Sequence, residues 1–132
     1  MLRASVAMAM VALLAAAPAA AKRKTSDAEL AELLKGRTAE PAVRCITPTT
    51  NDSQRIISGK AIVYGSGRRI WVNVPIGRLD TMRWDDVLVT ERFGGQLCRN
   101  DQIRIVDRFS HVPRPILRLG DFVPYVKGPA RR

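Results

Sequence analysis

The sequence predicts a mainly β domain, in which one short N-terminal helix precedes five to seven antiparallel strands that curl into a small barrel or sandwich. Three observations predict this α+β fold. Residues 26–36 combine helical periodicity with signals for both helix ends. From residue 38 onward, short runs of β-branched residues alternate with glycine-rich turns. Two cysteines, Cys45 and Cys98, are available to crosslink a sheet of this size.

The first 21 residues have the three-part layout of a secretory signal peptide. Arg3 supplies a positive charge, residues 4–17 form an alanine-rich apolar run, and small residues follow up to Ala21. We expect cleavage between Ala21 and Lys22. The alternative is a membrane anchor, but the run is shorter than the roughly 20 residues of a spanning helix. The expected mature chain is residues 22–132, a single domain without a transmembrane anchor, in a periplasm or outside the cell.

The chain is strongly basic. Its 22 Lys and Arg residues against 12 Asp and Glu residues give a formal net charge of +10, which favours anionic partners. Export argues against nucleic acid and for an anionic envelope component or an acidic protein. The simpler alternative is that scattered arginines keep a small domain soluble. The basic stretches 22–25 and 127–132 are expected to be mobile tails.

The helix is expected over residues 26–35. Ser26 is a capping residue, and Glu29 three positions later completes a capping box. An apolar stripe at helical spacing follows, and Gly36 is typical of a helix C-terminus. A helix this short needs a surface for its stripe, which consists of Leu30, Leu33 and Leu34.

A three-strand meander is expected next, over residues 55–57, 61–64 and 69–76, with glycine turns between the strands. In the third strand, alternation predicts that one face of aliphatic side chains points to the core. This aliphatic face consists of Ile70, Val72, Val74 and Ile76.

Further strands are expected over residues 87–90 and 102–107, with a bend near residues 96–98 and a turn at Asn100 and Asp101. Residues 110–120 contain two prolines and are expected to be irregular. Residues 122–126 are expected to form the last strand. Pro124 lacks an N–H group, which predicts an edge or a bulge there.

A disulfide between Cys45 and Cys98 is the expected state of the cysteines, since the count is even and the predicted compartment is oxidising. Two buried free thiols are the alternative. A structural zinc site is not expected, because it needs four ligands and the chain has a single histidine, His111.

Seven short motifs run through residues 33–125 of the chain, namely residues 33–37, 45–46, 61–64, 71–73, 86–90, 96–98 and 120–125. Together these motifs resemble a family of small uncharacterised secreted proteins from Gram-negative, sphingomonad-type bacteria. The resemblance implies an exported single domain with a Cys45–Cys98 pair, and it implies no activity and no functional residues. Family members often carry further cysteines in loops that match residues 77–80 and 116–119, where this chain has none.

No pattern in the sequence predicts catalysis. Ser66 or Ser110 with His111 would need a carboxylate, and no nucleophile-elbow motif is present. Asp85 and Asp86 are neighbours whose side chains would point to opposite faces of a strand, so a turn role is expected for them rather than an acid–base pair. No metal site and no cofactor are expected.

A cationic, aromatic surface is the expected binding site, since an arginine fork beside an indole can hold a phosphate, a carboxylate or a sugar. The alternative is that Trp71 covers a second small core beneath the helix. The expected function is a non-enzymatic envelope module, with a small periplasmic enzyme of unknown reaction as the alternative. The candidate ligand-binding residues are Tyr64, Arg68, Arg69, Trp71 and Asn73.

Overall fold

The structure is a computed structural model that describes residues 21–49, 52–92 and 94–128. Residues 1–20 of the expected signal peptide and residues 129–132 of the expected C-terminal tail lie outside these ranges. The expected leader and its cleavage therefore stay predictions.

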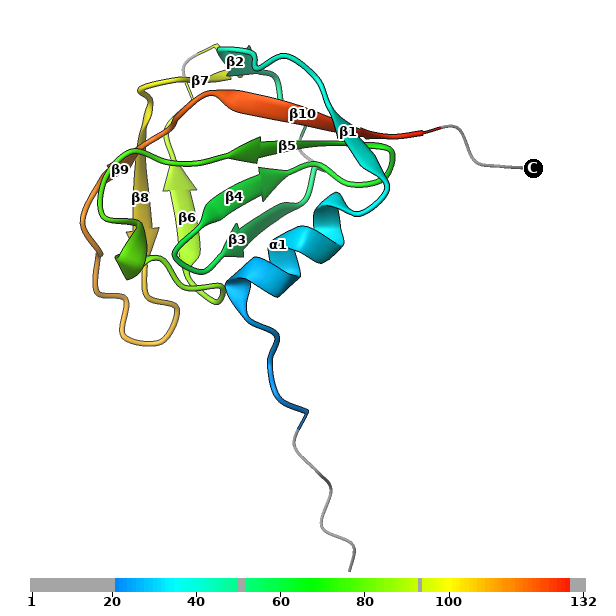
Figure 1. The fold of residues 1–132 in the computed structure, drawn as a ribbon. Coiled ribbons are helices and arrows are strands. Elements are labelled where there is room, and N and C mark those ends of the chain that lie inside the picture. The colour runs from blue at the N-terminus through cyan, green and yellow to red at the C-terminus, as the bar shows by residue number, and fades with distance from the viewer. Residues whose placement is uncertain (1–20, 50–51, 93, 129–132) are drawn as a thin grey trace, which may run out of the picture.

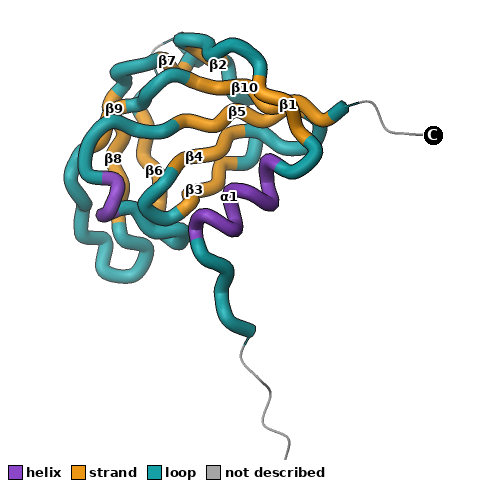
Figure 2. The backbone as a smooth tube through the Cα atoms, viewed as in Figure 1, coloured by secondary structure: helices purple, strands orange, loops and turns teal. Residues whose placement is uncertain are grey.

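The described residues form one α-helix and three antiparallel sheets (Figures 1 and 2). The sheets have the orders β1-β10-β5-β4-β3, β6-β8-β9 and β2-β7. The fold is mainly β, as predicted, but the described part of the chain has ten short strands instead of five to seven, and the sheet is not closed into a barrel. The elements are α1 (Ser26–Leu34), β1 (Arg37–Ala39), β2 (Cys45–Ile46), β3 (Gln54–Ile57), β4 (Ala61–Tyr64), β5 (Arg69–Asn73), the 3₁₀ helix η1 (Leu79–Thr81), β6 (Val87–Thr90), β7 (Leu97–Cys98), β8 (Gln102–Val106), β9 (Leu117–Arg118) and β10 (Phe122–Lys127).

The helix α1 lies along the five-stranded sheet beside β3 (Figure 1). Its N-cap is Thr25, not the predicted Ser26, because the Thr25 hydroxyl accepts the Ala28 N–H at 3.3 Å. Gly36 follows the helix with a φ of 71°, the left-handed conformation that glycine adopts most easily. The expected docking surface is present, since Leu30, Leu33 and Leu34 pack on a small core of Ile57, Ala61, Val63, Ile70 and Val72.

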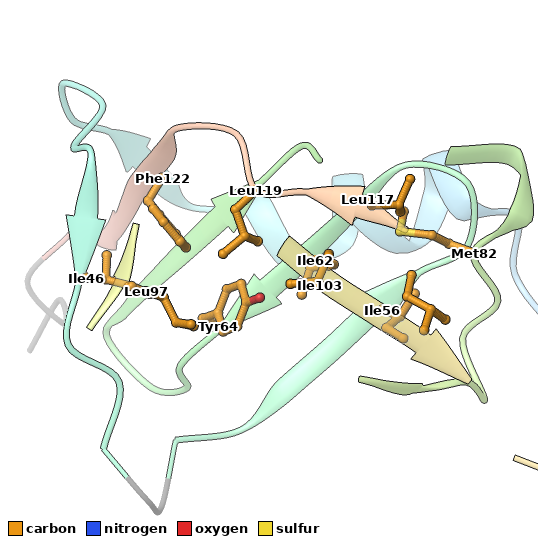
Figure 3. Close-up of a cluster of buried hydrophobic side chains, with 11 residues drawn as sticks. Ile46, Ile56, Ile62, Tyr64, Met82, Leu97, Ile103, Leu117, Leu119 and Phe122 are labelled. Atoms are coloured by element: carbon orange, nitrogen blue, oxygen red, sulfur yellow. The ribbon is translucent and has the colours of Figure 1, made fainter. Parts of the chain in front are cut away.

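The main core lies between the sheets (Figure 3). Strand β5 contributes to both cores, because successive side chains of a strand point to opposite faces. Ile70 and Val72 face the small core as predicted, while Val74 and Ile76 are exposed because β5 ends at Asn73. The main core consists of Ile46, Ile56, Ile62, Tyr64, Met82, Leu97, Ile103, Ile105, Leu117, Leu119 and Phe122.

Strand β10 is an interior strand, which corrects the expectation that Pro124 marks an edge. It pairs with β5 on one side and with β1 on the other. Pro124 has no N–H group to donate toward β1, and the chain after β1 leaves the ladder directly after Glu40 and rejoins it at Val43. The Glu40 N–H still bonds the Pro124 carbonyl at 2.8 Å, and the bridge to Phe122 resumes at Val43. The interruption of regular pairing that Pro124 predicts therefore lies in the segment between Glu40 and Val43, opposite β10.

The Cys45–Cys98 disulfide is confirmed, and the two cysteines are cross-strand partners in the β2-β7 pair. Residues 110–120 are mostly irregular, as predicted. The exception is β9, which continues the three-stranded sheet beside β8 and was missed in a segment rich in proline. Its Leu117 is fully buried and explains why the chain returns to the core here.

Candidate functional site

The predicted cationic, aromatic surface does not assemble as a surface. Tyr64 is 1% exposed and Asn73 is fully buried, so neither side chain is open to a ligand. Trp71 is half-buried and packs against the main core. The alternative, in which Trp71 covers a second small core beneath the helix, is wrong as well. The helix α1 packs on the small core, which lies on the opposite face of β5 from Trp71.

The two arginines of that predicted surface are exposed at the start of β5. Arg69 pairs with Glu40, with Nη1 and Oε2 2.8 Å apart. The backbone carbonyl of Arg68 accepts a hydrogen bond from Arg37 Nη1 at 3.0 Å. Arg68 and Arg69 stay candidates for ligand binding without the aromatic partners.

His111, the candidate general base, lies in an exposed loop with a φ of 59°. The Asp107 side chain shapes this loop by accepting the N–H groups of Phe109 and Ser110, each at 2.9 Å. The hydrogen bonds from Ser110 and Phe109 hold the pKa of the Asp107 carboxyl below its usual range. The carboxylate therefore serves to hold the turn.

Asp86 is occupied by structural contacts. Its buried carboxylate accepts the Arg83 N–H at 2.8 Å and forms a bidentate pair with Arg114, at 2.8 and 2.9 Å. Arg114 also reaches Asp107 at 3.0 Å. The turn role predicted for Asp86 is present, and the Arg114 bridge is an addition that sequence reasoning did not anticipate.

Among the described residues, no three His, Cys, Asp or Glu side chains gather closely enough to hold a metal ion.

A more open site lies where the edge strands β3 and β6 face each other. A groove of about 580 Å³ is present there, within the size range of ligand sites. Ile56 and Leu88 form its apolar floor, and both also belong to the main core or pack on it. We call this site the arginine groove. It is lined by Arg23, Glu29, Gln54, Arg55, Ile56, Trp84, Asp86, Val87, Leu88 and Arg108.

Trp84 gives the groove an aromatic wall. Its side chain is half exposed, and the Arg23 guanidinium lies 3.8 Å from the ring centroid in a cation–π contact. Arg23 also lies 3.5 Å from the Glu29 carboxylate. The predicted mobile tail 22–25 therefore contributes a groove side chain through Arg23 and the helix cap through Thr25.

The charge of the groove is not balanced internally. Glu29 is paired with Arg23, and Asp86 is paired with Arg114. Arg55 and Arg108 have no carboxylate within 4.0 Å among the residues that the structure describes, although Arg108 Nε donates to the Asp85 carbonyl at 2.9 Å. The guanidinium groups of Arg55 and Arg108 are therefore available to bind an anion in a groove that Trp84 also lines.

A second hollow of about 370 Å³ continues the arginine groove along α1. The two share Arg23, Glu29 and Arg55, and the second adds Lys24, Glu32 and Leu33. Lys24 pairs with Glu32 there. Of the two arginines without a described carboxylate partner, Arg55 therefore lines both hollows, and Arg108 lines only the arginine groove.

The sequence signal for this site was weak. Arg55 lies in a predicted strand, and neither Arg108 nor Trp84 is among the residues predicted to bind a ligand. Their sequence positions are far apart, and only the packing of α1, β3 and the β6 sheet brings them to one groove. A tryptophan that directly follows an arginine, Arg83-Trp84, is the one local hint.

Comparisons of the chain with protein-family models, with curated proteins and with solved structures gave no match. Within the described residues, no helix has the length and apolar character needed to cross a membrane.

Proposed function

We propose that this protein is a non-enzymatic, exported envelope module that binds an anionic ligand in the arginine groove. The observation that carries the proposal is the convergence of Arg55 and Arg108, neither of them paired with a described carboxylate, on a groove that also contains exposed Trp84. Arginine binds carboxylates and phosphates through its planar fork, which suits an anionic partner.

Export supports the envelope address. The signal-peptide pattern of residues 1–21 and the family resemblance both predict it, and a disulfide is typical of an oxidising compartment. The non-enzymatic part of the proposal is supported by the structural duties of Asp86 and Asp107, which hold a turn and a loop. Mass spectrometry of the protein secreted by its host tests export, and a retained residue 1 would contradict it.

Binding to defined anions tests the groove. The probes are fluorescein-labelled poly-L-glutamate, followed by anisotropy, and phosphatidylglycerol vesicles, followed by co-sedimentation, both at low ionic strength. We expect the Arg55→Ala, Arg108→Ala double variant to bind at least one probe about tenfold more weakly, since each exposed charge pair contributes roughly 0.2–1 kcal/mol. Added salt should weaken the binding, because exposed charges are screened.

The control is the Arg104→Ala, Arg118→Ala double variant. It removes the same charge from exposed positions on β8 and β9 that do not line the groove. Equal losses in both double variants would mean that net charge alone governs binding, and no binding of either probe would reject the proposal. An Arg68→Ala, Arg69→Ala variant tests the surface predicted from the sequence in the same assay.

A further inference from the structure

The arginine groove lies between two strand edges, and on each edge every second residue has backbone groups that no described residue bonds. Within the described part of the chain, β3 ends the five-stranded sheet and pairs with β4 alone, while β6 ends the three-stranded sheet and pairs with β8 alone. Figure 1 shows β3 at the border of its sheet, with β6 belonging to the layer behind. The groove is lined by residues of both strands.

On β3, the free groups belong to Gln54 and Ile56. The N–H and C=O of a strand residue point to the same side, and this side alternates along the strand. The Ser53 carbonyl accepts the Gly65 N–H and the Ile57 carbonyl accepts the Lys60 N–H, so odd-numbered residues face β4. Gln54 and Ile56 therefore point their backbone groups away from β4, where no described residue bonds them.

On β6, the same argument identifies Leu88 and Thr90. The Ile105 carbonyl in β8 accepts the Arg114 N–H, so Ile105 faces the β9 side. Its neighbours Arg104 and Val106 then face β6, where they pair with Val89 and Val87. The backbone groups of Leu88 and Thr90 are left pointing away from β8.

These edges and the chemistry of the groove suit one kind of occupant. An extended peptide bonds an open strand edge through its backbone, while its side chains alternate between two faces. One set of side chains would contact the apolar floor of Ile56 and Leu88. The other set would lie near the guanidinium groups of Arg55 and Arg108, so carboxylate side chains are expected at these positions of the peptide.

We propose that the ligand of the arginine groove is an acidic, extended segment of a partner protein, which adds to the free edge of β3 as a further strand. This inference rests on the proposed anion-binding function and narrows it to a peptide. It predicts that binding needs the peptide's backbone N–H groups as well as its charge.

The test uses fluorescein-labelled Glu-Val-Glu-Val-Glu-Val with blocked ends, read by anisotropy against the protein produced from the full chain. Two further peptides carry N-methyl groups on every Glu or on every Val. N-methylation removes the strand-forming donors of one side and keeps the charges. We expect the parent peptide to bind, the Arg55→Ala, Arg108→Ala variant to weaken it about tenfold, and at least one N-methylated peptide to bind more than tenfold more weakly.

A protein-side variant tests the same edge. Gln54→Pro removes a donor that faces the groove, and proline is tolerated at the first residue of an edge strand. We expect a threefold to tenfold loss of peptide affinity relative to Gln54→Ala, about the contribution of one hydrogen bond. Circular dichroism of both variants verifies folding, and the N-methylated peptides give the answer if Gln54→Pro does not fold.

The outcomes separate the two proposals. If both N-methylated peptides bind like the parent and still depend on Arg55 and Arg108, strand addition is overturned and anion binding stands. If phosphatidylglycerol vesicles bind through the same arginines but no peptide does, the peptide class is overturned. If no anionic probe binds, both proposals are rejected.

Discussion

Asn73 and Gly120 exchange two hydrogen bonds inside the protein. Asn73 Nδ2 donates to the Gly120 carbonyl at 2.8 Å, and the Gly120 N–H donates to Asn73 Oδ1 at 2.9 Å. Asn73 is fully buried, and a Cβ on Gly120 would lie 2.4 Å from the Val74 carbonyl oxygen. The pair fixes the end of β5 against the chain that enters β10, and it needs an amide at one position and glycine at the other.

Asn73→Ala should therefore destabilise the fold. It leaves two buried backbone groups of Gly120 without partners, at a cost of about 1–3 kcal/mol for each group. We expect the free energy of unfolding, measured by urea denaturation, to fall by about 2–4 kcal/mol. Gln96→Ala, at an exposed position, is the control. A loss below about 0.5 kcal/mol would show that water satisfies Gly120 instead.

Tyr64→Phe should leave stability unchanged or raise it by up to about 1 kcal/mol, because a buried hydroxyl without a partner is unfavourable. Among the described residues, the Tyr64 hydroxyl has no hydrogen-bond partner. Burial raises the pKa of this phenol above its usual range, with nearby Arg92 opposing the shift. The ring itself packs edge-to-face on Phe122, with centroids 5.7 Å apart, and phenylalanine keeps that contact.

Thermal unfolding of Tyr64→Phe beside Tyr125→Phe measures the effect. Tyr125 is half-buried on the small core, so it reports the general cost of removing a phenol oxygen. A clear loss of stability in Tyr64→Phe alone would mean that its hydroxyl has a partner in the folded protein.

Removing the disulfide should lower the free energy of unfolding by roughly 4 kcal/mol in the chain-entropy account, since the two cysteines are 53 residues apart. The Cys45→Ala, Cys98→Ala variant tests this by urea denaturation. Dithiothreitol should shift the wild-type transition toward that of the variant and leave the variant unaffected. Identical wild-type curves with and without reductant would contradict the expectation.

Asp107→Asn should reduce stability at neutral pH but not in acid. Hydrogen bonds from the Ser110 and Phe109 N–H groups lower the pKa of Asp107 in the folded state, compared with about 3.9 in an unfolded chain. A group whose pKa is lowered by folding stabilises the protein above its unfolded pKa, and this stabilisation is lost as the pH falls through the folded pKa.

The measurement is urea denaturation of wild type and Asp107→Asn over a pH series. We expect a constant difference in unfolding free energy above about pH 5, which narrows as the pH falls below the unfolded pKa. Asp80→Asn, on an exposed carboxylate whose one ion pair among the described residues is with Arg78, gives a comparison outside this loop. A difference that grows in acid would contradict the assigned cause.

The sequence predicted the local features well. The leucine stripe of α1, the meander β3-β4-β5 and the Cys45–Cys98 pair depend on nearby spacing or on counting. The faces of β5 were harder, because alternation cannot show that a second core lies on the other side of a strand. Asn73 therefore looked like a surface residue.

The candidate site was not predictable from local pattern. Arg23, Arg55, Trp84 and Arg108 belong to four separate segments, and only tertiary packing puts them at one groove. The free strand edges are likewise a property of the sheet order, which the strand runs do not determine. Pro124 shows the same limit, because its place inside the sheet depends on a detour in another strand.

That detour has a consequence for how the chain tolerates change. Residues 41 and 42 lie between the Glu40–Pro124 hydrogen bond and the Val43–Phe122 bridge and belong to no strand, so these two positions have no ladder bond to keep. A residue gained or lost between Glu40 and Val43 would be absorbed there, while the pairings on either side hold their alignment. Length variation among related chains should collect at this point.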